Sequence, residues 1–312
     1  MLKIENLHVQ LEKTNIHILK NISLCVNKGE LFGIAGESGS GKSVLAKTLL
    51  GLIKSPLKKK GGKILFKNKE LKTAKDFREI RGKKISMIFQ NPTASLNPVL
   101  TIGEQLIETI KIHKKCNEKT ARNIAINLLR EVEIDLPEKR LKSYPFNLSG
   151  GMNQRVMIAL ALSSDPEVLI ADEPTTALDV TTQTKIIRLL LKLKKDKGLT
   201  IIFISHDLSL LEMISDKILI LYSGETMELI TKKNLQQNKI KHPYTYALKK
   251  SVPNIEHKEE YLYSIPGTIE QNSKLYDNAC IFYKRCDRKR ENCSKQKPVF
   301  KDNLKCFYPL DN

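Results

Sequence analysis

The chain has 312 residues, of which 41% are apolar, enough for one large domain with an appendage or for two domains. It has no run of 18 apolar residues and no apolar core of a secretory signal at its start, so we expect a cytosolic protein that reaches a membrane only through partners. The net charge of +19 raises the question of nucleic acid, but the lysines are spread along the chain, which favours a solvated lysine-rich surface.

The most informative stretch is residues 36–43, which carry the pattern G-x-x-x-x-G-K-[ST] between an apolar run, 31–35, and a helical pattern from Lys42 to about Ile53. Glycines let backbone N–H groups turn toward phosphate oxygens, and a helix N-terminus adds positive charge. The pattern predicts that Lys42 reaches the β- and γ-phosphates and that Ser43 ligates Mg²⁺. The candidate nucleotide-binding residues are Gly36, Glu37, Ser38, Gly39, Ser40, Gly41, Lys42 and Ser43.

The flanking segments predict an α/β fold. Residues 1–35 read as antiparallel strands that lead to the strand before the loop, and a lysine- and glycine-rich turn at 58–62 precedes a short strand at 63–66. A strand at 84–89 ends at Gln90. Ligands of open α/β sheets bind at the carboxyl ends of strands, although Gln90 alone could equally be a surface loop residue.

Residues 91–164 read as a helical subdomain inserted in the α/β core. Thr101 and Glu104 form a capping box, and the apolar spacing within 121–132 gives one helix face. The segment ends in a helix opened by Ser149, Gly150 and Gly151, which is a potential but weak anion site.

Candidate catalytic groups follow the helical segment. A short apolar strand, Val168–Ala171, leads into Asp172 and Glu173. Two carboxylates there are costly unless a cation or a reacting proton uses them. Asp172 can hold Mg²⁺ through its water shell, and Glu173 can polarise an attacking water. The next predicted strand ends at His206; a lone histidine is more often structural, but this position favours function.

Taken in order, these motifs resemble those of the ATP-binding subunit of an ABC transporter. Residues 36–43 resemble Walker A, Gln90 the Q-loop, 148–152 the signature, 168–173 Walker B, 177–179 the D-loop and His206 the switch histidine. Residues 95–98, the signature variant with Met152, 172–181 and 242–245 are similar to the dipeptide/oligopeptide/nickel importer subfamily. The resemblance spans essentially the whole chain.

The resemblance implies a domain plan. The expected fold is a P-loop NTPase (RecA-like) α/β core with an N-terminal antiparallel β subdomain and a helical subdomain at about 91–164, all within an ABC ATPase domain at 1–231. Residues 232–312 are then a cysteine-containing C-terminal domain of the oligopeptide/dipeptide permease type.

The resemblance also implies a mechanism in which two ATPase subunits close head to tail. Glu173 is the expected base. Lys42, Gln90 and His206 are expected to neutralise charge during phosphoryl transfer. Mg²⁺ is expected to be held by Ser43, Gln90 and Asp172. The D-loop residue is Asp179. The signature residues expected to contact ATP of the partner subunit are Leu148, Ser149, Gly150, Gly151 and Met152.

The implied function is ATP hydrolysis that energises import of di- and oligopeptides, with a nickel or metal-chelate importer as the alternative. The expected partners are a second, paralogous ATPase subunit, two transmembrane permease subunits and an extracytoplasmic substrate-binding protein, at the cytoplasmic face of the inner membrane. A nucleic-acid-associated ABC ATPase is the alternative of another class; such proteins usually carry two cassettes and this chain has one Walker A, so no nucleic acid partner is expected.

Four cysteines near the end have the spacing Cys280-x5-Cys286-x6-Cys293-x12-Cys306. Structural zinc sites usually include a closer pair, and disulfides are disfavoured in the cytosol. Iron–sulfur clusters tolerate varied spacing, and resemblance to permease ATPases implies a [4Fe–4S] cluster; zinc and unliganded thiols stay open.

The chain departs from the family at the adenine contact. The family usually stacks adenine on an aromatic residue of the N-terminal strands, and residues 1–31 contain no Phe, Tyr or Trp. Either His17 substitutes for that residue, or recognition of the base is weak.

Overall fold

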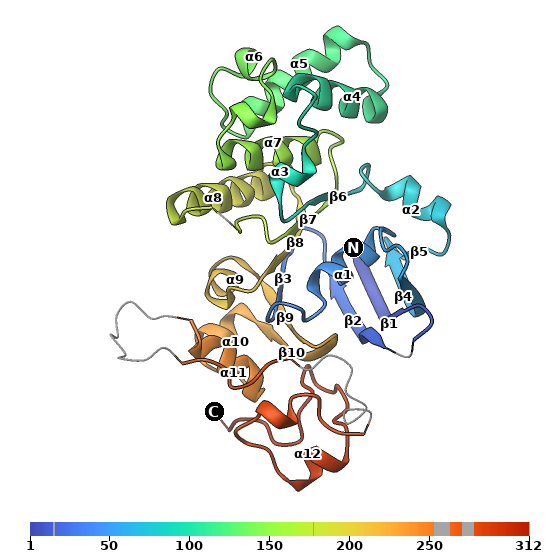
Figure 1. Ribbon diagram of the computed structural model, residues 1–312, viewed down its shortest axis with the longest axis vertical. Coiled ribbons are helices and arrows are strands. Elements are labelled where there is room, and N and C mark those ends of the chain that lie inside the picture. Colours follow the sequence, from blue (N-terminus) through green and yellow to red (C-terminus); the bar gives the residue numbers. More distant parts are fainter. Residues whose placement is uncertain (15, 177, 253–262, 270–277, 312) are drawn as a thin grey trace. The chain divides into compact units, whose positions relative to one another are not determined.

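The computed structural model describes residues 1–14, 16–176, 178–252, 263–269 and 278–311 (Figure 1). The chain divides into two compact units. The first consists of Met1–Thr73 with Phe203–Asn312, and the second of Ala74–Ile202. Strand β8 (Thr200–Ser205) starts in the second unit and ends in the first.

An antiparallel sheet begins the first unit. Its order is β2-β1-β4-β5, and these strands span His17–Val26, Leu2–Leu11, Leu57–Phe66 and Lys69–Glu70. Leu2 of β1 lies opposite Val26 of β2 and Phe66 of β4. Alternate apolar side chains of β1 and β2 are buried, as expected of a sheet with one covered face. The predicted antiparallel N-terminal strands are confirmed.

Strand β4 is longer than the sequence predicts. The lysine- and glycine-rich residues 58–62, expected to form a turn, belong to the strand, which begins at Leu57 and pairs with β1 as far as Leu11. Lys58 and Lys60 are exposed, so the strand keeps its charges in water while its backbone completes the ladder with β1. Pairing with a neighbouring strand therefore outweighs the local turn signal.

A second group of strands carries the loop after residue 35. Strand β3 (Leu31–Ala35), which is buried throughout, runs parallel to β9 (Lys217–Tyr222), and β10 (Glu225–Thr231) pairs antiparallel with β9. Three helices of this unit pack near these strands: α9 (Leu208–Ile214), α10 (Lys232–Gln236) and α11 (Pro243–Lys250). Helix α1 (Lys42–Leu49), which follows β3, contacts β2. Helix α1 stops short of the predicted Ile53, because Leu50 and Gly51 donate backbone hydrogen bonds to Lys47 and Thr48 and turn the chain.

The second unit contains the parallel pair β6 (Ile85–Ile88) and β7 (Val168–Asp172), with Ile85 opposite Val168. Its helices are α2 (Ala74–Ile80), α3 (Pro92–Ser95), α4 (Ile102–Lys114), α5 (Glu118–Glu131), α6 (Pro137–Arg140), α7 (Gly150–Leu162) and α8 (Val180–Lys197), with the 3₁₀ turn η1 (Pro145–Asn147). The predicted capping box is confirmed: Thr101 accepts from the N–H of Glu104, whose carboxylate accepts from the N–H of Thr101. The hydroxyl of Thr101 also donates to this carboxylate at 2.7 Å, and this bond together with the one from the N–H of Thr101 holds the pKa of Glu104 below its usual value.

In the C-terminal part of the first unit, the described residues after α11 form little regular structure. Its short elements are η3 (Tyr283–Arg285) and α12 (Glu291–Lys295). Backbone hydrogen bonds tie the last residues to β10, from Leu229 to Asn303 and from Lys305 to Met227. No helix in the described ranges has the length and apolarity needed to cross a membrane.

Candidate functional site

The loop between β3 and α1 passes so close to β9 that only glycine fits at its first position. Gly36 has a φ of 156°, and a Cβ there would lie 2.2 Å from the carbonyl oxygen of Leu221. Lys42 is only 5% exposed, and its side chain folds back over the loop. Its Nζ donates to the carbonyl oxygens of Gly36 at 2.7 Å and Glu37 at 2.9 Å. The ammonium group is thereby placed on the loop that the sequence predicts to hold phosphate.

This loop has the features of an anion cradle. No side chain caps the N-terminus of α1, and the fully buried hydroxyl of Ser40 has no hydrogen-bond partner among the described residues. Phosphate oxygens suit a helix start with a nearby ammonium group and small loop residues. The residues present therefore fit a nucleotide phosphate group.

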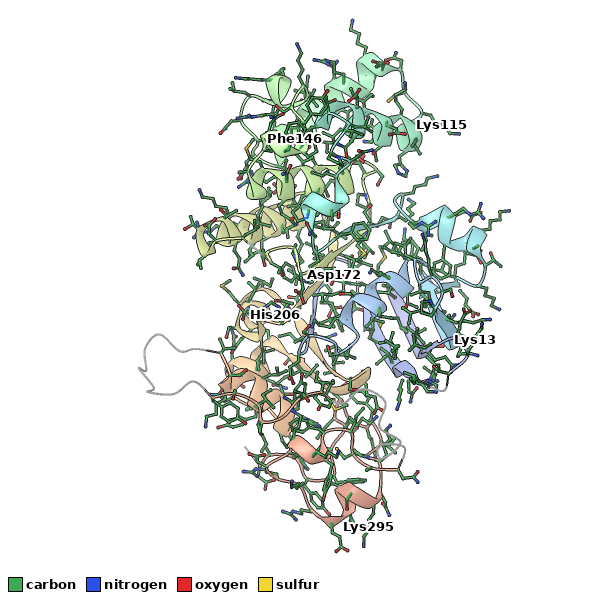
Figure 2. The ribbon with its side chains drawn as sticks, in the orientation of Figure 1. Lys13, Lys115, Phe146, Asp172, His206 and Lys295 are labelled. Carbon is green, nitrogen blue, oxygen red and sulfur yellow. The ribbon has the colours of Figure 1, made fainter. Side chains whose placement is uncertain are left out.

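In the second unit, Glu173 follows directly from the end of β7. Two side chains donate to its Oε2: the amide of Gln90 at 3.0 Å and the hydroxyl of Thr176 at 3.0 Å. Glu173 has a φ of 46°, a left-handed conformation that is uncommon outside glycine and that recurs at functional sites. The preceding Asp172, labelled in Figure 2, is 3% exposed. The structure thus joins two of the residues singled out in the sequence, Gln90 and Glu173, and adds Thr176.

Sequence reasoning missed Thr176. The only available signal was a hydroxyl three residues after Glu173, and the turn that brings it back involves a backbone hydrogen bond from Thr176 to Glu173. A threonine at this spacing has many other uses, so the pattern alone does not select it.

The candidate signature and D-loop meet in the same unit. Ser149 caps α7 by accepting from the N–H of Met152 at 3.3 Å, and Asp179 caps α8 by accepting from the N–H of Thr182 at 2.9 Å. A Cβ on Gly151 would lie 2.6 Å from the methyl group of Thr182, so the absent side chain lets the two helix starts approach closely. Hydrogen bonds from Thr182 lower the pKa of Asp179. Leu148 is buried, Gly150 is exposed, and Ala177 of the expected D-loop lies outside the described residues.

His206 follows the end of β8 and is exposed, within the first unit (Figure 2). The turn after it is held by Asp207, which donates its N–H to the hydroxyl of Ser205 at 3.0 Å and accepts from the N–H of Leu210 at 3.0 Å. Lys42, Ser43 and His206 therefore belong to one unit, whereas Gln90, Asp172, Glu173 and the signature belong to the other.

Comparison with known families identifies this arrangement. The family model described as "ABC transporter" matches residues 19–176, a range that includes the phosphate loop, Gln90 and Glu173. This chain belongs to the ABC transporter family. A second model, described as "Oligopeptide/dipeptide transporter, C-terminal region", matches residues 227–293.

Relatives similar to this ABC ATPase extend over its whole length. The dipeptide transport ATP-binding protein DppD of Escherichia coli K12 is 40% identical over 323 positions, covering 100% of this chain and 98% of the relative. DppD of Bacillus subtilis is 40% identical, covering 96% of this chain and 90% of the relative. The oligopeptide transport ATP-binding protein AppD of Bacillus subtilis is 39% identical, with coverages of 96% and 92%.

Solved structures confirm the predicted ATPase fold. The cassette MJ0796 in a dimeric post-hydrolysis state bound to ADP and Pi has a TM-score of 0.66 and 31% identity, covering 74% of this chain and 99% of that one. The protein cbiO1 from Clostridium perfringens has a TM-score of 0.67 and 29% identity, with coverages of 76% and 91%. Members of this family hydrolyse ATP with Mg²⁺, and the hydroxyl, amide and carboxylate oxygens of Ser43, Gln90 and Asp172 are of the type that Mg²⁺ prefers.

The four C-terminal cysteines of the ABC ATPase surround one small cavity. The thiols share its lining with His242, Phe282 and Tyr308. None of the six cysteines forms a disulfide, and burial raises the pKa of Cys280 to about 12 and that of Cys286 to about 11. As the side chains lie, no three His, Cys, Asp or Glu residues in the described ranges are placed to hold one metal ion. The predicted iron–sulfur cluster therefore stays a prediction.

His17, the sequence-based candidate for contact with adenine, lies at the start of β2. It lines a cavity together with His8, Lys20 and a C-terminal segment around Lys297. The neighbouring Ile18 and Leu19 lie close to Gly41 of the phosphate loop. The strand that carries His17 is therefore adjacent to the loop, while contact with a base stays a prediction.

Proposed function

We propose that this ABC ATPase hydrolyses ATP to energise the import of di- and oligopeptides. The observation that carries the proposal is the similarity of its C-terminal region to oligopeptide/dipeptide transporters at residues 227–293. Full-length similarity to the dipeptide and oligopeptide transport proteins of Escherichia coli and Bacillus subtilis supports it.

The nucleotide site proposed here is built around residues 36–43. Its backbone N–H groups and the Lys42 ammonium group neutralise and orient the phosphates, because phosphoryl transfer depends mainly on positioning and charge stabilisation. Ser43, Gln90 and Asp172 would hold Mg²⁺, which when bound neutralises charge on the phosphate oxygens. Their hard oxygen donors and the ammonium group already lying on the loop support these roles.

Glu173 is the proposed general base. Its carboxylate accepts two hydrogen bonds at one oxygen, from Gln90 and Thr176, which fixes the orientation of the group that takes a proton from water. Its left-handed backbone is a further indication, since strain of this kind persists where the surroundings impose it. His206 is proposed to stabilise charge on the transferring phosphoryl group.

The chain is proposed to act with partners at the cytoplasmic face of the cell membrane. In this scheme residues 148–152 and Asp179 complete the site of a second ATPase subunit, expected to be a paralogue. Two transmembrane permease subunits and an extracytoplasmic substrate-binding protein complete the transporter. Support comes from the family to which the chain belongs. In addition, Ser149 and Gly151 lie at a helix start, which suits an anion.

The cysteine cavity is a separate, finer proposal. Four thiols that line one cavity are candidate ligands of a [4Fe–4S] cluster once their side chains rotate toward a common centre. Anaerobic purification followed by iron and acid-labile sulfide analysis tests it. Four iron and four sulfide per chain, lost in Cys286→Ser, support the cluster; zinc alone or neither element contradicts it.

The transport proposal is tested by uptake in cells that express the native chain, Glu173→Gln or the control Glu138→Gln. Glu138 is a surface residue paired with Arg130, and such pairs contribute little. We expect dipeptide and longer peptide uptake to collapse only in Glu173→Gln, with nickel uptake unchanged. Loss of nickel uptake alone supports the metal importer, and no change in any uptake contradicts a transport role.

A further inference from the structure

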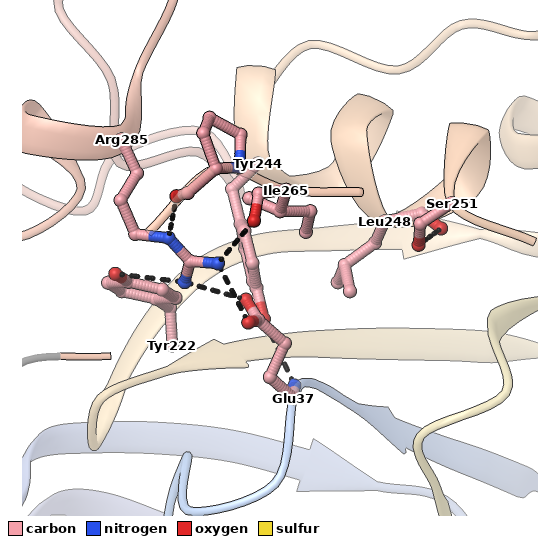
Figure 3. A network of polar contacts seen from close by, with 8 residues as sticks. Glu37, Tyr222, Tyr244, Leu248, Ser251, Ile265 and Arg285 are labelled. Carbon is pink, nitrogen blue, oxygen red and sulfur yellow. Dashed lines mark hydrogen bonds and ion pairs between the residues drawn. The ribbon is translucent and has the colours of Figure 1, made fainter. Parts of the chain in front are cut away.

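A residue from the cysteine-containing region reaches the phosphate loop. Arg285 ends η3, between Cys280 and Cys286, and its side chain is only 6% exposed. Its two terminal nitrogens donate to the two carboxylate oxygens of Glu37, at 3.0 and 2.9 Å (Figure 3). This is a bidentate pair, the geometry in which arginine and carboxylate bind most specifically.

Every N–H group of the Arg285 guanidinium has a hydrogen-bond acceptor. Nε donates to the carbonyl oxygen of Pro266 at 2.8 Å, one terminal nitrogen also donates to Ile265 at 3.3 Å, and the other to the hydroxyl of Tyr222 at 3.3 Å. With the two bonds to Glu37, the five N–H groups have five acceptors. The site is therefore specific for arginine, because an ammonium group has three donors and no planar fork.

Glu37 is held through its backbone as well. Its N–H donates to the hydroxyl of the fully buried Tyr244 at 3.1 Å, and its carbonyl oxygen accepts from Ser40 at 3.2 Å and from the Lys42 Nζ at 2.9 Å. Tyr244 packs edge-on to Tyr222, with ring centroids 4.7 Å apart. The residue beside the phosphate-binding lysine is thus fixed at its N–H, its carbonyl and its carboxylate.

Charge explains why this matters for nucleotide. A carboxylate within an anion-binding loop repels phosphate unless a cation neutralises it. The guanidinium group of Arg285 neutralises Glu37 from the side, while Lys42 stays on the loop. We propose that Arg285 is a positioning residue that keeps the phosphate loop formed and electrostatically open to nucleotide, and so couples the C-terminal cysteine region to ATP binding. This inference rests on the proposed nucleotide site at residues 36–43.

The test is the dissociation constant of MgADP for the full chain, measured by calorimetry, together with KM and kcat for ATP. Arg285→Gln should raise the dissociation constant and KM roughly tenfold, about 1.4 kcal/mol, with kcat changed much less. Arg285→Lys should recover part of this loss, because it keeps the charge but not the fork. Adding Glu37→Gln to Arg285→Gln should also recover affinity, because the unpaired carboxylate is gone. The exposed Arg288, changed to glutamine, is the matched control and should bind MgADP like the native chain.

Coupling is reciprocal, so a second readout follows from the same proposal. MgADP should slow amide hydrogen exchange at residues 279–296 in the native chain but not in Arg285→Gln. Native affinity in a folded Arg285→Gln would overturn the proposal. If that variant does not fold, native affinity in Arg285→Lys overturns it instead. Failure of the native chain to bind MgADP would remove the proposed nucleotide site, a result distinct from unchanged affinity in the variants.

Discussion

At the scale of single residues, the orientation of Glu173 depends on two donors that approach the same carboxylate oxygen. Gln90 comes from the end of β6 and Thr176 from the turn that follows β7. A base must be oriented before its pKa matters, so in the proposed mechanism these donors control how well Glu173 can meet a water molecule.

The hydroxyl of Thr176 provides the first prediction. Thr176→Val keeps the shape but removes one hydrogen bond to a charged group, of about 1.5–3 kcal/mol. Part of that energy orients Glu173, so we expect ATP turnover to fall roughly tenfold, about 1.4 kcal/mol, with little change in ATP affinity. Thr184→Val is the matched control, because the Thr184 hydroxyl donates to the carbonyl oxygen of Val180 within α8. Equal turnover in both variants would remove the role of Thr176.

At the scale of elements, the starts of α7 and α8 approach each other through a missing side chain. Gly151 of α7 faces the methyl group of Thr182 on α8, whereas a Cβ on Gly150 would meet Leu178 at an ordinary 3.6 Å. The start of α7, which carries the candidate signature, therefore packs against the first turn of α8, which follows the candidate D-loop. Ser149 and Asp179 cap these two helix starts.

Two neighbouring glycines give a paired prediction at this contact. Gly151→Ala forces Thr182 to move and should destabilise the chain by about 1–3 kcal/mol, the usual range for overpacking. Gly150→Ala fits its site and should leave stability unchanged or raise it by about 0.5–1 kcal/mol. Differential scanning calorimetry of the two variants measures the difference. Equal melting temperatures would show that the helix starts do not depend on this close contact.

At the scale of the molecule, charged side chains bind the C-terminal region to the rest of the first unit. Arg285 binds Glu37, and Lys297 and Lys305 both bind Glu225, which is fully buried on β10. Burial alone would raise the pKa of Glu225, but the two ammonium groups outweigh it and hold the pKa below its usual 4.5. Some of the basic residues behind the net charge of +19 therefore form ion pairs inside the fold.

The lowered pKa of Glu225 makes stability depend on pH. Because the folded pKa is depressed, its contribution is present above the unfolded value near 4.5 and is lost as the pH falls through the folded pKa. Melting temperatures of the native chain should therefore drop more steeply than those of Glu225→Gln between about pH 5 and pH 3. Glu291→Gln, on the exposed α12 pair with Lys295, is the control. Parallel pH profiles for the native chain and Glu225→Gln would contradict this account.

Local signals in the sequence predicted a large part of this architecture. The phosphate loop, the capping box at Thr101 and the apolar strand before Asp172 depend on residues within a few positions of each other, and each has a specific pattern. The turn expected at 58–62 was wrong because pairing with β1 is a tertiary effect.

Contacts between distant residues could not be predicted in the same way. Arg285 and Glu37 are 248 positions apart, and neither residue has a pattern that names the other. Thr176 depends on the exact path of a turn. Such pairs can be identified only once the fold is known, because their energy comes from burial and geometry rather than from local spacing.

Residues 36–43 are proposed to bind ATP, and Glu173 is proposed to drive its hydrolysis. The most direct measurement compares MgATP binding and steady-state turnover of the native chain, Glu173→Gln and the surface control Glu138→Gln. We expect Glu173→Gln to bind MgATP within about threefold of the native affinity while its turnover falls roughly 10²–10⁴-fold, and Glu138→Gln to match the native chain in both. Native turnover in Glu173→Gln would contradict the account.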